Sequence, residues 1–239
     1  MFFPIRDDQP RYSTPLVNYF IIGLNALVFL YELSVEAQGG RAFHNFVDQF
    51  AVVPKHFQLA LAGSHNYSIA AVTLTLFTAM FMHASVMHIL GNMWVLWIFG
   101  DNIEDYLGHG LYLVFYLLCG SIASLTQILF SLHPPGSSVP SLGASGAIAG
   151  VMGAYFLLYP RAKVLTWVVF IFFWWLPAWI WLGCWFALQF FSGAATSLAG
   201  ANQATGGIAF MAHVGGFVAG LALIKLFPRR SQIRRYASW

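Results

Sequence analysis

The sequence predicts an all-α membrane protein in which six transmembrane helices form a single bundle. Of its 239 residues, 59% are hydrophobic and only 8% are charged, whereas a soluble domain carries about 25% charged residues. A chain this poor in charge has too few solvated side chains to cover a globule, so its apolar surface must face lipid. No polar linker is long enough to separate two domains.

Six segments are apolar enough to cross a bilayer, which requires about 20 mostly apolar residues. We expect each of them to be a helix, because hydrocarbon offers no partner to unpaired backbone N–H and C=O groups. The fourth segment is short, and the fifth is interrupted by Pro177. The segments run roughly from Leu16 to Leu33, Leu76 to Phe99, Leu111 to Leu132, Ser145 to Tyr159, Val164 to Phe191 and Gly207 to Phe227.

The basic residues fall mostly on one side of the predicted membrane. Of the eleven Lys and Arg residues, nine lie in the N-terminal segment, the fourth loop and the C-terminal end, while Arg41 and Lys55 lie in the long first loop. Cytoplasmic loops carry an excess of Lys and Arg, so both termini are expected in the cytoplasm. We expect a cytoplasmic segment at 1–15, the six-helix domain at 16–227 and a basic cytoplasmic tail at 228–239, in a prokaryotic cell membrane.

The most informative polar side chains lie within the second, fourth and sixth apolar segments, where polar groups are costly and often functional. The second segment carries His83, His88 and Asn92, the fourth begins at Ser145, and the sixth carries His213. With the N-terminus inside, all three segments run from the outer to the inner side of the membrane. At 1.5 Å per residue, the last four of these residues belong to the outer half, provided that the second helix begins later than its apolar run.

Ser145 and His213 have the side chains of a nucleophile and its general base. A serine hydroxyl becomes a useful nucleophile when a base takes its proton. No predicted span contains Asp or Glu in its interior, so the chemistry would be that of a Ser–His dyad rather than a Ser-His-Asp triad. The Gly-x-Ser-x-Gly motif of soluble hydrolases is not matched either, because Gly146 and Ala147 follow the serine.

His88 and Asn92 are candidates for the groups that stabilise negative charge. They are four residues apart, so they project from one face of a helix. Neutral hydrogen-bond donors on one face suit an oxyanion hole, which needs fixed donors where negative charge develops. The start of a helix at Ser145 adds unpaired backbone N–H groups and the positive end of the helix dipole.

Glycines spaced four apart predict close packing of the fourth and sixth helices. Gly146 and Gly150 follow the candidate nucleophile, and Gly216 and Gly220 follow the candidate base. Small residues at this spacing let helix backbones approach closely in a membrane. Such packing would bring the serine to the histidine.

Each of these features has a simpler explanation when it is taken alone. A serine in a spanning helix usually bonds its own backbone, and glycine steps are most often only packing faces. Zinc binding is disfavoured because the sequence has neither a His-Glu-x-x-His motif nor a Cys–His cluster. A transporter relaying protons through His88 and His213 would usually show membrane carboxylates or paired repeats. The main alternative is a non-catalytic binder of transmembrane helices, which predicts loss of Ser145 or His213, and both are present.

Three motifs, in this order along the chain, resemble those of the rhomboid family of intramembrane serine proteases. They are His83-x4-His88-x3-Asn92, Gly143-Ala144-Ser145-Gly146, and Ala212-His213-Val214-Gly215-Gly216 with Gly220. The segment from Gly100 to Gly108 is also similar to the family's loop after the second span. The resemblance covers roughly Phe77 to Leu226.

The resemblance implies a rhomboid-type six-helix bundle that acts as a serine endopeptidase. Its partners would be the lipid bilayer and single-span transmembrane protein substrates, with no cofactor, no metal and no nucleic acid. By position, Ser145 would be the nucleophile and His213 the general base. His88 and Asn92, with the backbone N–H of Ser145, would hold the oxyanion. The oligomeric state is left open.

Two features depart from the family pattern. Some members carry a tyrosine four residues after the nucleophile, stacked on the base histidine, and here that position is Ala149. Many members have a Trp-Arg pair in the first loop, and this dipeptide is absent from the sequence. We therefore expect other residues to orient His213.

Overall fold

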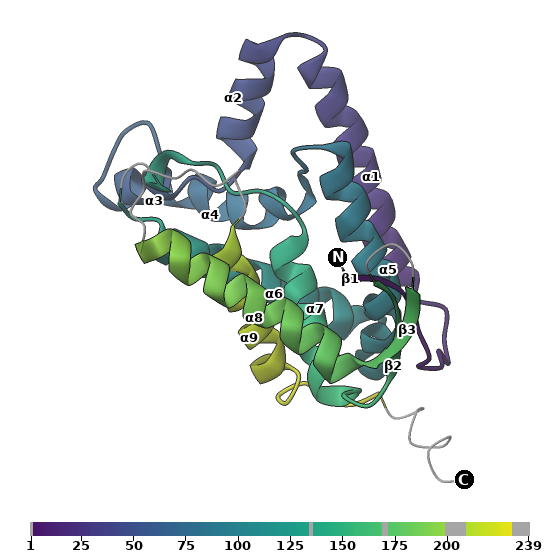
Figure 1. Ribbon diagram of the computed structural model, residues 1–239. Coiled ribbons are helices and arrows are strands. Elements are labelled where there is room, and N and C mark those ends of the chain that lie inside the picture. Colours follow the sequence, from purple (N-terminus) through teal and green to yellow (C-terminus); the bar gives the residue numbers. More distant parts are fainter. Residues whose placement is uncertain (1, 134–135, 169–171, 199–208, 231–239) are drawn as a thin grey trace.

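The computed structural model describes residues 2–133, 136–168, 172–198 and 209–230 and is mainly helical (Figure 1). Helices α1, α6 and the first part of α8 are each long and apolar enough to cross a membrane, and the bent pair of α4–η1 and α5 adds a fourth candidate among the described residues. Helices α7 and α9 are apolar but have only 14 residues each. The protein is thus a helical membrane protein, as predicted, while the number of six spans stays a prediction.

The elements follow one another along the chain in a fixed order. They are β1 (Phe2–Asp7), α1 (Leu16–Glu36), α2 (Gly40–Phe50), α3 (Pro54–Leu61), α4 (Ile69–Thr78), the 3-10 helix η1 (Ala79–Phe81), α5 (Val86–Leu107), α6 (His109–Phe130), the 3-10 helix η2 (Gly136–Ser138), α7 (Ser145–Leu158), β2 (Lys163–Val168), β3 (Phe172–Pro177), α8 (Ala178–Leu198) and α9 (Phe210–Leu223).

The second predicted helix is broken, which corrects the expectation of one continuous span from Leu76 to Phe99. The pieces α4–η1 and α5 meet at an angle of 82°. Helix α5 begins only at Val86, because the Ser85 hydroxyl caps it by accepting the backbone N–H of His88. His88 therefore lies in the first turn of α5, and Asn92 lies one turn further, about 9 Å along the helix from its start.

The first part of the fifth predicted helix is a β-hairpin, so the expectation that Val164 to Phe191 is all helix is wrong. Strands β2 and β3 pair antiparallel, and β1 pairs with the other edge of β2, in the order β1-β2-β3. The run is rich in Val, Thr, Phe and Trp, which favour strands. Pro177 disfavours helix in the residue before it, so α8 begins immediately after this proline.

Carboxylates at the C-terminal end of α5 hold the start of α1. The first turn of α1 has no side-chain cap of its own. The buried Glu104 carboxylate accepts the backbone N–H groups of Val17 and Asn18 at 2.9 and 2.7 Å. Asp105 likewise accepts the N–H of Ser13 at 2.9 Å. Negative charge at a helix N-terminus is favourable, so these contacts fix α1 against α5.

Helix α7 lies at the centre of the bundle, packed against α5, α6, α8 and α9 (Figure 1). The predicted glycine packing of α7 against α9 is confirmed. A Cβ added to Gly216 would overlap the carbonyl oxygen of Gly146, and one added to Gly220 would overlap that of Gly150. The two backbones are therefore in direct contact along the first two turns of α7.

Candidate active site

Ser145 and His213 meet where the N-terminal ends of α7 and α9 come together. Ser145 is the first residue of α7, and His213 is the fourth residue of α9. The serine Oγ lies 2.7 Å from His213 Nε2, within hydrogen-bond distance. The glycine contacts explain this proximity, since Gly146 and Gly216 touch directly beside the pair. The arrangement allows the hydroxyl to donate its proton to the imidazole.

The second ring nitrogen of His213 faces helix α8. Nδ1 lies 2.7 Å from Oε1 of Gln189, which is half-buried. The ring also lies beside the indole of Trp185, with 5.7 Å between centroids and 39° between planes. Sequence reasoning missed Gln189, although it is the only amide in the apolar run from Val164 to Phe191. A single amide in such an apolar run was the sequence feature that could have identified Gln189 as a candidate site residue.

His88 and Asn92 lie beside the loop that leads into Ser145. A Cβ at Gly143 would come within 2.9 Å of the His88 ring and 3.8 Å of Asn92 Nδ2. Gly143 also has a φ of 125°, which side-chain-bearing residues rarely adopt. The backbone N–H of Ala84 is 3.4 Å from His88 Nδ1. Because Nδ1 accepts there, Nε2 carries the proton and is a donor.

A buried pair of residues supports Asn92 from behind. The Asn92 Nδ2 group lies 3.0 Å from His83 Nε2, which must accept because an amide nitrogen only donates. The Glu32 carboxylate at the end of α1 accepts the backbone N–H of His83 at 3.0 Å. His83 and Glu32 are 1% and 2% exposed. Sequence reasoning did not connect Glu32 to the site, because the contact spans 51 residues.

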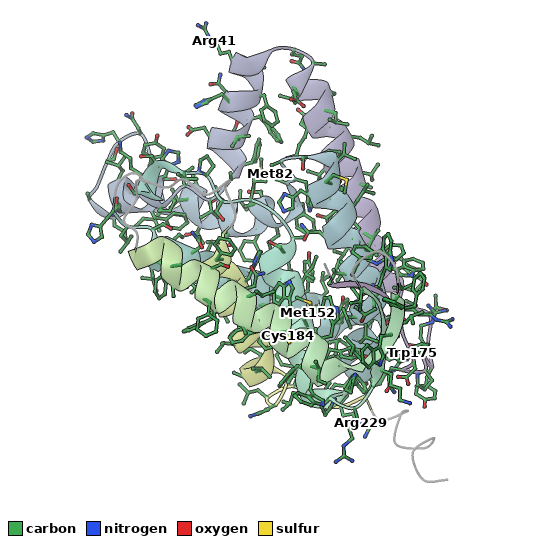
Figure 2. The ribbon with its side chains drawn as sticks, viewed as in Figure 1. Arg41, Met82, Met152, Trp175, Cys184 and Arg229 are labelled. Atoms are coloured by element: carbon green, nitrogen blue, oxygen red, sulfur yellow. The ribbon has the colours of Figure 1, made fainter. Side chains whose placement is uncertain are left out.

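The candidate residues line one cavity of about 720 Å³ between α5, α7, α8 and α9. Its wall is mainly apolar and includes Val95, Ile148 and Met152, and Figure 2 shows Met152 inside the bundle. A few polar groups on an apolar wall are typical of a binding site. These groups are Ser85, His88, Asn92, Ser145, Gln189 and His213.

Comparison with known families covers most of the helical part of the chain. Residues 71–230 match the family model of the rhomboid domain. The chain belongs to the rhomboid family. The matched residues include all four site residues predicted from the sequence.

Several curated rhomboid proteins are similar to the chain. "Rhomboid protein 1, mitochondrial" of Saccharomyces cerevisiae is 32% identical over 142 residues, which are 59% of this chain and 38% of the yeast protein. "Rhomboid protease GluP" of Bacillus subtilis is 38% identical over 145 residues, 61% of this chain and 24% of the relative. "Presenilin-associated rhomboid-like protein A, mitochondrial" of Danio rerio is 40% identical over 84 residues, 35% and 22% of the two chains. The chain thus matches less than two fifths of each of these three relatives.

One departure from the rhomboid pattern has a structural counterpart. Ala149, which occupies the position of the family's stacking tyrosine, is fully buried in α7. The aromatic side chain beside His213 is instead Trp185, which comes from α8. His213 is therefore contacted by a ring from a different helix than the family pattern predicts.

Proposed function

We propose that the protein is an intramembrane serine endopeptidase that cleaves transmembrane-helix substrates with Ser145 and His213. The observation that carries the proposal is the 2.7 Å contact between Ser145 Oγ and His213 Nε2. Family membership supports it, since one similar rhomboid is named a protease. The apolar cavity beside the pair supports a substrate that is itself apolar.

In the proposed reaction, His213 Nε2 takes the hydroxyl proton while Ser145 Oγ attacks the carbonyl carbon of the scissile peptide. The negative oxygen that forms would be held by His88 Nε2–H, by the free N–H of Asn92 and by the backbone N–H of Ser145. His213 then gives its proton to the leaving amine. Water hydrolyses the acyl-enzyme, with the same histidine as base, and the serine is regenerated.

The test is covalent labelling of the purified protein with a fluorophosphonate, followed by mapping of the labelled residue. We expect label on Ser145, none in Ser145→Ala and strongly reduced label in His213→Ala. Both variants should lose cleavage of a single-span substrate, and the double variant should be no worse than either, because the pair acts as a unit. Label on another serine, or cleavage by Ser145→Ala, would exclude this mechanism.

For topology, we propose that both termini lie in the cytoplasm, with the cavity opening toward the outer side. Figure 2 shows Arg41 and Arg229 at opposite ends of the molecule, and nine of the eleven Lys and Arg residues lie in the N-terminal segment, the stretch after α7 and the C-terminal end of the sequence. Cysteine-accessibility labelling near each terminus tests this, and a terminus labelled from outside would contradict it.

For the compartment, we propose a prokaryotic cell membrane. The Bacillus relative agrees with this location, whereas the mitochondrial names of the yeast and zebrafish relatives speak against it. Fractionation of the native cells decides between the two. Recovery of the protein with mitochondria would contradict the proposal.

A further inference from the structure

Gln189 contacts the ring nitrogen of His213 that does not face Ser145. Its Oε1 lies 2.7 Å from Nδ1, and Nε2 of the same ring lies 2.7 Å from the serine hydroxyl. An amide oxygen can only accept, so Nδ1 carries the ring proton and Nε2 keeps the lone pair that a general base needs. We propose that Gln189 is a positioning residue that holds His213 in the tautomer able to deprotonate Ser145. The inference rests on the proposed function.

This hydrogen bond becomes stronger as the proposed reaction proceeds. When Nε2 takes the proton from Ser145, the ring becomes an imidazolium and Nδ1–H becomes a charged donor. Charged donors make hydrogen bonds roughly twice as strong as neutral donors. Gln189 Oε1 therefore stabilises the ring more after proton transfer than before it. With the amide turned over, its NH2 group would face Nδ1, force the proton onto Nε2 and repel the imidazolium.

Gln189 takes a place in which soluble serine proteases carry an aspartate. Within the described part of the chain, it is the only group hydrogen-bonded to His213 Nδ1. The other side chain from α8 beside the ring, Trp185, packs at 5.7 Å between centroids and limits how the ring can turn. Acceptor and aromatic wall together fix both the tautomer and the orientation.

The position of Gln189 on α8 links the base to a third helix. The helices that carry Ser145 and His213 meet backbone to backbone at their glycines. By contrast, α8 meets α9 through side chains, such as Phe186 stacked on Phe217 with 4.6 Å between centroids. An outward displacement of α8 would therefore remove the acceptor from Nδ1 before it separated the serine from the histidine. Gln189 also lines the cavity. The hydrogen bond to His213 Nδ1 would therefore form or break according to the position of α8.

Substitutions of Gln189 that keep its length test the role of its oxygen. Gln189→Met removes the acceptor, whereas Gln189→Glu keeps an oxygen at the same distance along the side chain. Loss of a hydrogen bond to a charged group corresponds to about 10- to 100-fold in rate. We expect kcat to fall by this factor in Gln189→Met with KM unchanged, and to return to within a few-fold of the wild type in Gln189→Glu. Leu188→Met, at an exposed neighbouring position, is the matched control and should match the wild type.

Nitrogen NMR of histidine-labelled protein reads the tautomer directly, with the His213 signal identified by its absence in His213→Ala. We expect the proton on Nδ1 in the wild type and Gln189→Glu, and a shift toward Nε2 in Gln189→Met. This readout needs no turnover, and the tautomers of the wild type and Gln189→Glu can still be read if Gln189→Met does not fold. A wild-type proton on Nε2, a wild-type kcat in folded Gln189→Met, or no recovery in Gln189→Glu would overturn the proposal. Cleavage by Ser145→Ala would instead overturn the proposed function.

Discussion

The contact between the α7 and α9 backbones predicts a severe effect of one added methyl group. In Gly216→Ala, the new Cβ would overlap the carbonyl oxygen of Gly146, which is a backbone atom. Real Cβ atoms essentially never approach another heavy atom within 3.0 Å. No side-chain rotation can relieve this overlap, so the two helices must separate. Because Gly146 follows Ser145 and Gly216 lies one turn after His213, the separation acts directly on the candidate dyad.

The size of the effect follows from the geometry. A separation of about 1 Å would lengthen the 2.7 Å contact between Ser145 and His213 to about 3.7 Å, beyond hydrogen-bond range. Misplacement of this size typically costs about 100-fold in rate. Overpacking of this kind also destabilises a fold by about 1–3 kcal/mol. We therefore expect Gly216→Ala to retain about 1% of wild-type cleavage and to unfold at a lower temperature.

The assay compares cleavage of a transmembrane substrate, fluorophosphonate labelling and thermal unfolding for Gly216→Ala and Gly23→Ala. Gly23 is the control, since a Cβ at this position in α1 meets nothing within 4 Å. Gly23→Ala should cleave normally and be equally stable or stabilised by up to about 1 kcal/mol, because alanine favours helix. Wild-type cleavage by Gly216→Ala would show that close approach of α7 and α9 is not needed, and would refute the reasoning.

Two further predictions concern the oxyanion donors and the N-terminal strand. His88→Ala and Asn92→Ala should each slow cleavage by about 100- to 1000-fold with the fold intact; normal cleavage by both single variants and by the double variant would make them packing groups. Burial raises the pKa of Asp7 to about 6, above its ordinary 3.8, against an opposing hydrogen bond from Tyr155. The folded state therefore binds this proton more tightly, so the contribution to stability is present below about pH 4 and is lost as the pH rises through 6. Asp7→Asn should stabilise the protein by roughly 1–2 kcal/mol at pH 7.5 and by little at pH 4; equal gains at both pH values in thermal unfolding would contradict this.

The break before α5 could not be placed from hydrophobicity. Residues from Leu76 to Phe99 read as one apolar run, yet the chain bends by 82° between η1 and α5. The bend depends on the Ser85 cap and on the Glu32 carboxylate, which accepts the backbone N–H of His83 from α1. Hydropathy reports how well a segment suits lipid, but it carries no information on a partner 51 residues away.

The hairpin before α8 shows the same limit. The residues of β2 and β3 are as apolar as a spanning helix, and the partner strand β1 comes from the very start of the chain. Whether such a run pairs as a strand or coils as a helix depends on that partner, because propensity for strands is weak and context-dependent. Tertiary structure decided between the two.

The apolar composition of the sequence alone predicted a helical membrane protein. A few polar side chains stood out as candidate site residues because polar groups are costly within lipid. The sequence also predicted that Ser145 and His213 would meet, since glycine steps beside both residues permit close helix packing. Only the tertiary structure placed Gln189 against the base and His83 behind Asn92. These contacts join side chains on separate helices or across a bend, and their geometry depends on the tilt and rotation of whole elements, which no local pattern encodes.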